Sequence, residues 1–412
     1  MTQYYDDLET RDAQQREQAL FRALPAQIQH AKTHAAYFAQ VLEGIDANEI
    51  RDRKALALLP ITRKSDLIEA QKRSPPFANM AAISTGNLGR VFSSPGPIYD
   101  PQGARGDFWR FGRALFAAGF RRGDLMHNTF SYHFTPAGFM MDLAAQAVGC
   151  AVFPAGVGQT ELQVAAIADL KPNGYAGTPS FLKILLDKAD ELGKDATSLK
   201  KASVSGEALL PPVRALLNSR GIAVRQCYGT ADLGLIAYET EPTQGLVVDE
   251  GVIVEIVRLG TGEPVGENEV GEVVVTTFCN EYPLIRFATG DLSAIAAGRS
   301  NCGRTNMRIK GWMGRADQAT KVKGMFVHPS QIVQVGKRHP EILKARLCVE
   351  HDAQRNDRMR LKCEVRERSA ALSQAIAESL RDVCKLRGEV DFADPGCLPA
   401  DGKVIEDLRN YD

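Results

Sequence analysis

The chain lacks several features that would assign it to a broad class of protein. Its 50 Lys and Arg residues are matched by 50 Asp and Glu residues, so the formal net charge is zero. Such a balance gives no electrostatic footprint for nucleic acid or for an anionic membrane surface. No apolar run approaches the roughly 18 residues that a membrane-spanning helix needs. The acidic, polar start has no signal-peptide pattern, which predicts a cytoplasmic protein without nucleic-acid or membrane partners.

Cysteine pairs with metal-ligand spacing are also missing. The eight cysteines are dispersed, and none forms a C-x-x-C pair or a small disulfide scaffold. Cys302 precedes Gly303 and Arg304, which would suit half of a zinc ribbon, but no second ligand pair flanks it. We therefore expect most of the cysteines to be buried thiols that pack as small apolar residues.

The 412 residues suffice for a large domain followed by a small one. Apolar residues recur at spacings of three and four within residues 1–75, which predicts helices with one break at Pro25. Short β-type runs alternate with helical stretches over 76–245, a pattern typical of a parallel α/β sheet. Residues 246–316 carry paired β-runs around a Gly-rich turn, which predicts antiparallel hairpins in a β-rich part.

The remaining residues, 317–412, are expected to form a separate α+β domain. Their pattern is helix, strand, turn and strand, followed by an amphipathic helix over 371–387. A module of this size can bury its own core, so the predicted fold is α/β, with a large domain over 1–316 and a small C-terminal domain. The boundary falls in a polar stretch between Gly314 and Gly324, which also fits an ordinary surface linker.

Four short segments carry residue types that suit chemistry: SGEALLPP (205–212), QCYGTADLG (226–234), RFATGDL (286–292) and LPADGKVIEDLRN (398–410). Taken singly, each fits a structural role, because a Gly-Asp pair usually makes a turn and a lysine near a terminus is usually solvated. Their order and spacing in one chain carry more information than any one of them.

In this order the segments resemble the acyl-adenylate-forming superfamily, and within it the phenylacetate–CoA ligase-like family. The resemblance covers nearly the whole chain and includes these matching segments: 59–67, 158–185, 281–292 and 302–332. It implies an ATP-dependent, AMP-forming acid–thiol ligase. A small carboxylic acid attacks the α-phosphate of ATP, which releases pyrophosphate, and the CoA thiol then displaces AMP. The implied cofactors are ATP/AMP, Mg²⁺ and coenzyme A, and the resemblance allows a homodimer.

The resemblance also implies a nucleotide site. The adenine would contact Ser205, Gly206, Glu207, Ala208, Tyr228 and Gly229. Thr230 would hydrogen-bond the α-phosphate, and Asp291 would accept from both ribose hydroxyls, as an ionised carboxylate can. Arg315 would lie near the same ribose or phosphate. Lys403 would neutralise the oxygen where the carboxylate attacks, as a compact mobile cation can.

Three further roles follow from the resemblance. Asp317 would be the hinge about which the C-terminal domain turns between the two half-reactions, and Gly324 would lie on the CoA path. The acyl pocket would use aromatic residues suited to an aryl acid: Tyr132, His133, Phe134 and Phe139. Several of these also fit the core, and His133 suits either an orienting role toward the carboxylate or a packed ring.

The chain departs from the resembled pattern at the triphosphate. Of the usual Ser/Thr/Gly-rich phosphate loop only Ser93, Ser94 and Gly96 remain, and no lysine follows. Pro95 and Pro97 have no backbone N–H to offer a phosphate oxygen. Asp232 stands where the family usually has a Mg²⁺-positioned glutamate, and its shorter side chain reaches a metal less directly.

Three hypotheses follow. The first is an AMP-forming acyl–CoA ligase for an aryl or other small carboxylic acid. The second is a non-catalytic or regulatory protein that binds AMP, acyl-adenylate or acyl-CoA, motivated by the degenerate phosphate loop. The third keeps adenylation but transfers the product to an acceptor other than CoA.

Overall fold

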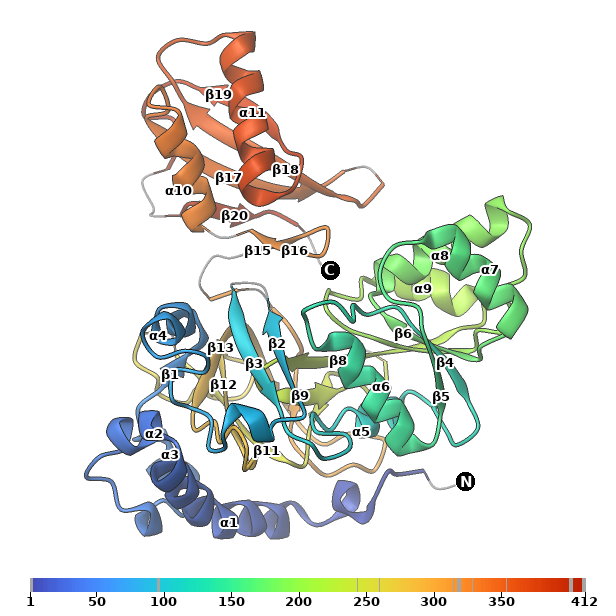
Figure 1. The fold of residues 1–412 in the computed structure, drawn as a ribbon, viewed down its shortest axis with the longest axis vertical. Coiled ribbons are helices and arrows are strands. Elements are labelled where there is room, and N and C mark those ends of the chain that lie inside the picture. Colours follow the sequence, from blue (N-terminus) through green and yellow to red (C-terminus); the bar gives the residue numbers. More distant parts are fainter. Residues whose placement is uncertain are drawn as a thin grey trace. The chain divides into compact units, whose positions relative to one another are not determined.

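Two compact units make up the chain, Met1–Met313 and Gly314–Asp412 (Figure 1). The computed structural model describes the following residues: 3–94, 97–242, 244–258, 260–313, 315–316, 320–327, 329–352, 354–399 and 403–409. No described helix is long and apolar enough to cross a membrane.

The helices of the first unit are η1 (Asp7–Thr10), α1 (Ala13–His34), α2 (Ala36–Val41), η2 (Ala47–Glu49), α3 (Arg53–Ala57), η3 (Lys64–Asp66), α4 (Leu67–Arg73), η4 (Thr85–Asn87), α5 (Gly112–Ala117), α6 (Ala137–Val148), α7 (Thr160–Leu170), α8 (Pro179–Glu191) and α9 (Pro211–Ser219). Its strands are β1 (Thr62–Arg63), β2 (Arg90–Ser94), β3 (Ile98–Gln102), β4 (Leu125–Asn128), β5 (Ala151–Pro154), β6 (Gly174–Gly177), β7 (Lys201–Val204), β8 (Ala223–Thr230), β9 (Gly234–Tyr238), β10 (Leu246–Val248), β11 (Val252–Val257), β12 (Val270–Thr277), β13 (Phe287–Ala296) and β14 (Arg308–Ile309).

Helix α1 corrects one sequence prediction, because it continues through Pro25 without a break. Proline removes one backbone donor from a helix interior and disfavours the preceding turn. Here the apolar face continues on both sides of the proline, with Leu24 and Ile28 fully buried in one core. The packing of that continuous face outweighs the lost hydrogen bond, so the expected break is wrong.

A parallel sheet forms the middle of the first unit, as predicted for this part of the chain. Strands β5, β4, β6, β7 and β8 are neighbours in that order and run parallel. Successive side chains of a strand point to opposite faces. Tyr175 of β6 therefore packs in the core formed with α7, α8 and α9, whereas Ala176 belongs to the core that also contains residues of α5 and α6. Both faces are covered by helices (Figure 1), as a parallel sheet requires.

The sheet becomes antiparallel beyond β8. The order continues through β9, β10, β14, β13 and β12 to β11, and β11 pairs with β12 from Val252↔Thr277 to Val257↔Glu272. The prediction of antiparallel hairpins in this region is confirmed. All six residues of β11 are buried, which explains its almost continuous apolar run.

One buried arginine ties the N-terminal helices to this sheet. Arg286 has a left-handed φ of 44° and is almost fully buried. Its guanidinium forms hydrogen bonds of 3.1 Å to both carboxylate oxygens of Glu255. It also donates to the carbonyl oxygens of Ala57 and Leu59. Shortly after Leu59 the chain forms β1, which pairs in parallel with β13.

The second unit is an α+β module. It consists of β15 (Thr320–Val322), β16 (Met325–Val327), α10 (Pro329–Arg338), β17 (Lys344–His351), β18 (Asp357–Glu364), α11 (Ala370–Cys384), β19 (Glu389–Ala393) and β20 (Ile405–Asp407). Its four-stranded sheet has the order β19-β18-β17-β20. Residues of both helices pack with the sheet in a separate core that includes Ile332, Leu347 and Ile376.

The expectation for the cysteines is also confirmed. All eight are free thiols, and six of them are buried; Cys302 is half-buried and Cys397 is exposed. The described residues contain no group of three side chains suited to a metal ion.

Replacing Arg286 tests how far the fold depends on this arginine. Arg286→Ala leaves Glu255 buried without its cation, which should cost about 3–5 kcal/mol of unfolding free energy. Chemical denaturation followed by tryptophan fluorescence measures the loss. Arg258→Ala, which removes an exposed ion pair with Glu269, should leave the midpoint almost unchanged. Equal midpoints for the two variants would show that Arg286 has no such role.

Candidate functional site

The loops after β7 and β8 bring several predicted residues together. These strands are adjacent and parallel, with Val204 opposite Gln226, so the segments that follow them emerge at the same edge of the sheet. Ligands of open α/β sheets bind at such carboxyl ends. Ser205 follows β7 directly, and its Oγ donates to the carbonyl oxygen of Cys227 at 2.8 Å. Gly206 has φ of 85°, a left-handed conformation that favours glycine.

Glu207 lies in the same loop and is bound to the neighbouring helix. Its Oε1 accepts a hydrogen bond of 2.6 Å from the backbone N–H of Ser180 in α8. Ala208 follows and is half-buried. The predicted segment 205–208 is therefore held from two sides, by β8 and by α8.

Asp291 and Tyr228 are separated by 63 positions in the chain and form a hydrogen bond. Tyr228 Oη donates to Asp291 Oδ2 at 2.9 Å, and Trp312 Nε1 donates to Oδ1 at 3.1 Å. The backbone N–H of Asp291 donates to Thr289 Oγ1. Two aromatic donors thus fix the orientation of the buried carboxylate. Sequence reasoning gave no role to Trp312, although it lies within a segment that carries the resemblance.

The turn that carries Thr230 is held by residues 109–111. Trp109 Nε1 donates to the carbonyl oxygen of Ala231 at 3.1 Å, and Arg110 donates to that of Leu233 at 2.7 Å. A Cβ on Gly229 would lie 2.5 Å from the carbonyl oxygen of Gly234, so no larger residue fits there. Thr230 Oγ1 accepts from the N–H of Leu233. These contacts define the position of the threonine at the end of β8.

Asp232 has a partner that sequence reasoning missed. Its Oδ2 accepts from Lys64 Nζ at 2.5 Å, and its side chain is inaccessible to solvent. Asp100 of β3 is fully buried beside it. Burial and then the charge of Asp232 raise the pKa of Asp100 well above its usual range, and Lys64 offsets this only in part. A protonated Asp100 can donate toward Asp232, whose Oδ1 has no other partner among the described residues.

These surroundings do not fit the Mg²⁺ expected at Asp232. Mg²⁺ requires near-octahedral oxygen coordination and usually retains several waters. One oxygen of Asp232 is bound to a lysine, the other faces a second buried carboxyl group, and solvent reaches neither. The sequence signal for the lysine was available, because Lys64 lies in the segment 59–67 that carries the resemblance.

Ser93 and Ser94, which remain from the usual phosphate-loop pattern, lie on strand β2 of the hairpin β2–β3. The backbone N–H of Ser93 donates to the carbonyl oxygen of Phe134 at 2.9 Å, and the buried Ser94 Oγ donates to that of Ile98 at 3.4 Å. Gly96 lies outside the described residues. The hairpin is thus bonded to the segment predicted to line the acyl pocket.

The four aromatic residues proposed for the acyl pocket lie in two environments. The ring of Phe139 packs against Tyr132 at a centroid distance of 5.2 Å and against Phe92 at 5.5 Å. His133 and Phe134 are exposed, the latter at 77% of its surface. The structure therefore joins Tyr132 and Phe139 in one aromatic cluster and places the other two at the surface.

Four predicted residues belong to the second unit, and the structure describes three of them. Arg315 precedes β15, and Gly324 occupies the turn between β15 and β16 with φ of 83°. Lys323 and Gly324 both have positive φ, as a tight two-residue hairpin turn requires. Lys403 is exposed and lies just before β20. The hinge residue Asp317 lies outside the described residues.

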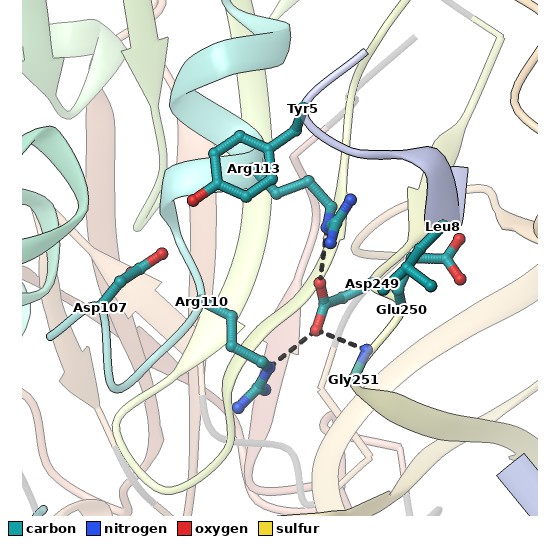
Figure 2. Close-up of a pocket in the computed structure, with 8 residues that line it drawn as sticks. All are labelled: Tyr5, Leu8, Asp107, Arg110, Arg113, Asp249, Glu250 and Gly251. Carbon is teal, nitrogen blue, oxygen red and sulfur yellow. Dashed lines mark hydrogen bonds and ion pairs between the residues drawn. The ribbon is translucent and has the colours of Figure 1, made fainter. Parts of the chain in front are cut away.

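A separate pocket of about 260 Å³ is lined by Tyr5, Leu8, Asp107, Arg110, Arg113, Asp249, Glu250 and Gly251. Figure 2 shows Asp249 between the two arginines. Arg110 Nε lies 2.7 Å from Asp249 Oδ2, and Arg113 Nε lies 3.4 Å from Oδ1. None of these residues was predicted to be functional. Arg110 contributes to both regions, since it also binds the turn that carries Thr230.

Asp107 in this pocket predicts how the stability of the fold depends on pH. Burial raises its pKa to about 6, against the opposing hydrogen bond from Gly112 N–H. The folded protein therefore binds the proton more tightly than the unfolded chain does, and stability is lost as pH rises through about 6. Asp107→Asn should raise the melting temperature relative to the parent more at about pH 7.5 than at about pH 5.

Thermal unfolding at the two pH values provides the measurement. Asp169→Asn at an exposed position of α7 is the matched control. A difference between Asp107→Asn and the parent that is the same at both pH values would contradict the prediction.

Comparison with known proteins places these features in context. A family model described as AMP-binding enzyme matches residues 110–280. The chain is 29% identical to phenylacetate-coenzyme A ligase of Thermus thermophilus, over 89% of this chain and 90% of that protein. It is 26% identical to the enzyme of the same name from Escherichia coli, over 98% of each chain.

The fold is similar to that of a solved 2-hydroxyisobutyryl-CoA ligase, crystallised with 2-HIB-AMP and CoA. The TM-score is 0.86 at 22% identity, over the whole of this chain and 93% of the other. The matches to the two curated ligases extend over nearly their full length. The chain is thus similar to phenylacetate-coenzyme A ligases over most of its length, and an AMP-binding family model matches its middle part.

Proposed function

We propose that the protein is an AMP-forming acyl–CoA ligase that activates a small carboxylic acid through an acyl-adenylate. The observation that carries the proposal is the set of contacts around Asp291, which Tyr228 and Trp312 hold at the same sheet edge as Ser205. An oriented carboxylate accepts hydrogen bonds from a vicinal diol, and the ribose of AMP presents one. The names of the relatives, phenylacetate-coenzyme A ligases, support the same reaction.

This placement supports the residue roles that the resemblance implies. The segment 205–208 and Tyr228 contact the adenine, Asp291 binds the ribose, and Thr230 donates to the α-phosphate. Ser93 and Ser94 face the outer phosphates from the hairpin β2–β3. Most of the catalysis is positioning and charge stabilisation, because the protein forms no covalent bond to the substrate.

The second unit supplies the remaining groups. Lys403 stabilises the charge that develops as the carboxylate attacks the α-phosphate, and Arg315 binds near the ribose or phosphate. The unit turns at Asp317 between the half-reactions, which brings Gly324 to the path of the pantetheine arm. The acid is aryl or similarly small, since the cluster of Tyr132 and Phe139 offers flat apolar surface. Mg²⁺ enters as the counter-ion of ATP rather than through Asp232.

A second candidate is a protein that binds AMP or acyl-adenylate without catalysing its formation. The degenerate phosphate loop favours it, because Pro95 and Pro97 offer no N–H to a phosphate. An adenylating enzyme that uses an acceptor other than CoA is a third candidate.

Pyrophosphate release separates these functions. The protein is incubated with ATP, Mg²⁺ and a panel of aryl and short-chain acids, with and without CoA. Release that depends on one acid, with thioester formed when CoA is present, is the expected result. No release with any acid, although AMP binds by calorimetry, supports the binding protein instead. Acid-dependent release with hydroxamate trapping but no thioester supports another acceptor.

Lys403→Ala tests the division of labour between the half-reactions. Loss of the cation should slow acid-dependent pyrophosphate release about 100-fold. Thioester formation from supplied acyl-adenylate and CoA should continue at the parent rate. Lys337→Ala at an exposed position of α10 serves as the control. If Lys403→Ala slowed both half-reactions equally, the assignment would fail.

A further inference from the structure

We propose that Lys64 is the cation that this chain places against the β- and γ-phosphates of ATP, with Asp232 holding its ammonium group in position. The inference rests on the proposed function, because it assigns a residue to the triphosphate of the same site. It starts from the phosphate loop, where the stretch from Arg90 to Pro101 contains no lysine. Polyphosphate carries several negative charges, and a cation from another segment can meet it beside the Mg²⁺ counter-ion.

The arginine in that stretch has other contacts. The guanidinium of Arg90 lies 4.5 Å from the ring centroid of Phe139 and donates to Gln102 Oε1 at 3.3 Å. Both contacts hold it on the aromatic cluster at the base of the hairpin. The charge facing the phosphates is thus expected from outside the loop.

The fold delivers Lys64 to the turn that carries Thr230. Strand β1 pairs with β13, with Thr62 opposite Phe287, and Lys64 is the residue that follows β1. Strand β13 also carries Asp291, the proposed ribose ligand. The side chain of Lys64 reaches Asp232. Asp232 lies two positions after Thr230, the proposed α-phosphate ligand. One lysine therefore joins the segments that contact the ribose and the α-phosphate.

Burial around this ion pair is strongly asymmetric. The Lys64 side chain is 22% exposed, whereas that of Asp232 is completely inaccessible. The carboxylate therefore lies on the inner side of the pair, beside Asp100 and near Tyr282. Lys64 Nζ donates to Asp232 on this inner side. A compact ammonium anchored from behind and reached by solvent suits a phosphate oxygen.

This arrangement also accounts for the poor fit of Asp232 to Mg²⁺. A carboxylate that anchors a lysine cannot at the same time present that oxygen to a metal. The chain combines an aspartate at the metal position with a phosphate loop that lacks its lysine, and the geometry links both departures through Lys64. The positive charge at the triphosphate comes from a side chain of the N-terminal segment.

Equilibrium binding in buffer with EDTA tests the inference without any contribution from metal. Calorimetry measures the affinities of the full chain for ATP, sodium pyrophosphate and AMP. Lys64→Ala should weaken the binding of ATP and of pyrophosphate about tenfold or more, because one charge-assisted hydrogen bond is lost. AMP affinity should remain within about twofold, because AMP lacks the outer phosphates. Lys72→Ala, an exposed lysine of the next helix paired with Glu69, should change none of the three.

A second variant guards against misfolding, because Lys64→Ala leaves Asp232 buried without its cation. The double variant Lys64→Ala/Asp232→Asn removes both charges and should show the same selective loss of affinity for ATP and pyrophosphate. Lys64→Arg keeps the charge and should restore part of the affinity. The inference is overturned if the double variant loses affinity for AMP and ATP equally, or loses affinity for neither.

The same measurements distinguish this inference from the proposed function. A parent protein that binds pyrophosphate through Lys64, yet releases none with any acid, contradicts the ligase and leaves the lysine assignment intact. Acid-dependent turnover that is unchanged by Lys64→Ala, with unchanged KM for ATP, contradicts the lysine assignment and leaves the ligase intact. A parent that binds neither ATP nor pyrophosphate contradicts both.

Discussion

The buried ion pair of Arg286 and Glu255 is the interaction on which the arrangement of the candidate site depends. A charge this deep in the protein must be fully paired, and the guanidinium meets this need by binding a carboxylate and the backbone of residues 57–59. This backbone lies just before β1, which pairs with β13 with Thr62 opposite Phe287. Lys64 follows β1 directly, and β13 carries Asp291, so this pairing joins the two segments.

Much of the fold could be predicted from the chain itself. Alternation of strands and helices gave the parallel sheet, and the paired apolar runs after residue 246 gave the antiparallel part. The break expected at Pro25 failed for a tertiary reason. Local propensity measures the cost of a proline in a helix, but it contains no information on the core that Leu24 and Ile28 share across it.

The candidate site was predictable as a set of segments but not as a set of contacts. The resemblance named Tyr228 and Asp291 separately, and the structure added the hydrogen bond between them and the second donor, Trp312. Lys64 is 168 positions from Asp232, so no local spacing links them. The pocket around Asp249 is likewise built from three distant segments, and no pattern within any one of them marks it.

The hydrogen bond from Ser93 to Phe134 has a consequence for engineering the acid specificity. The hairpin β2–β3 and the segment proposed for the acyl pocket share this backbone contact and the packing of Phe92 on Phe139. A substitution that changes the packing of Tyr132 on Phe139 therefore also acts on the hairpin through Phe92. Variants selected for bulkier acids should carry compensating changes on β2, because this strand is hydrogen-bonded to and packed against the segment proposed for the acyl pocket.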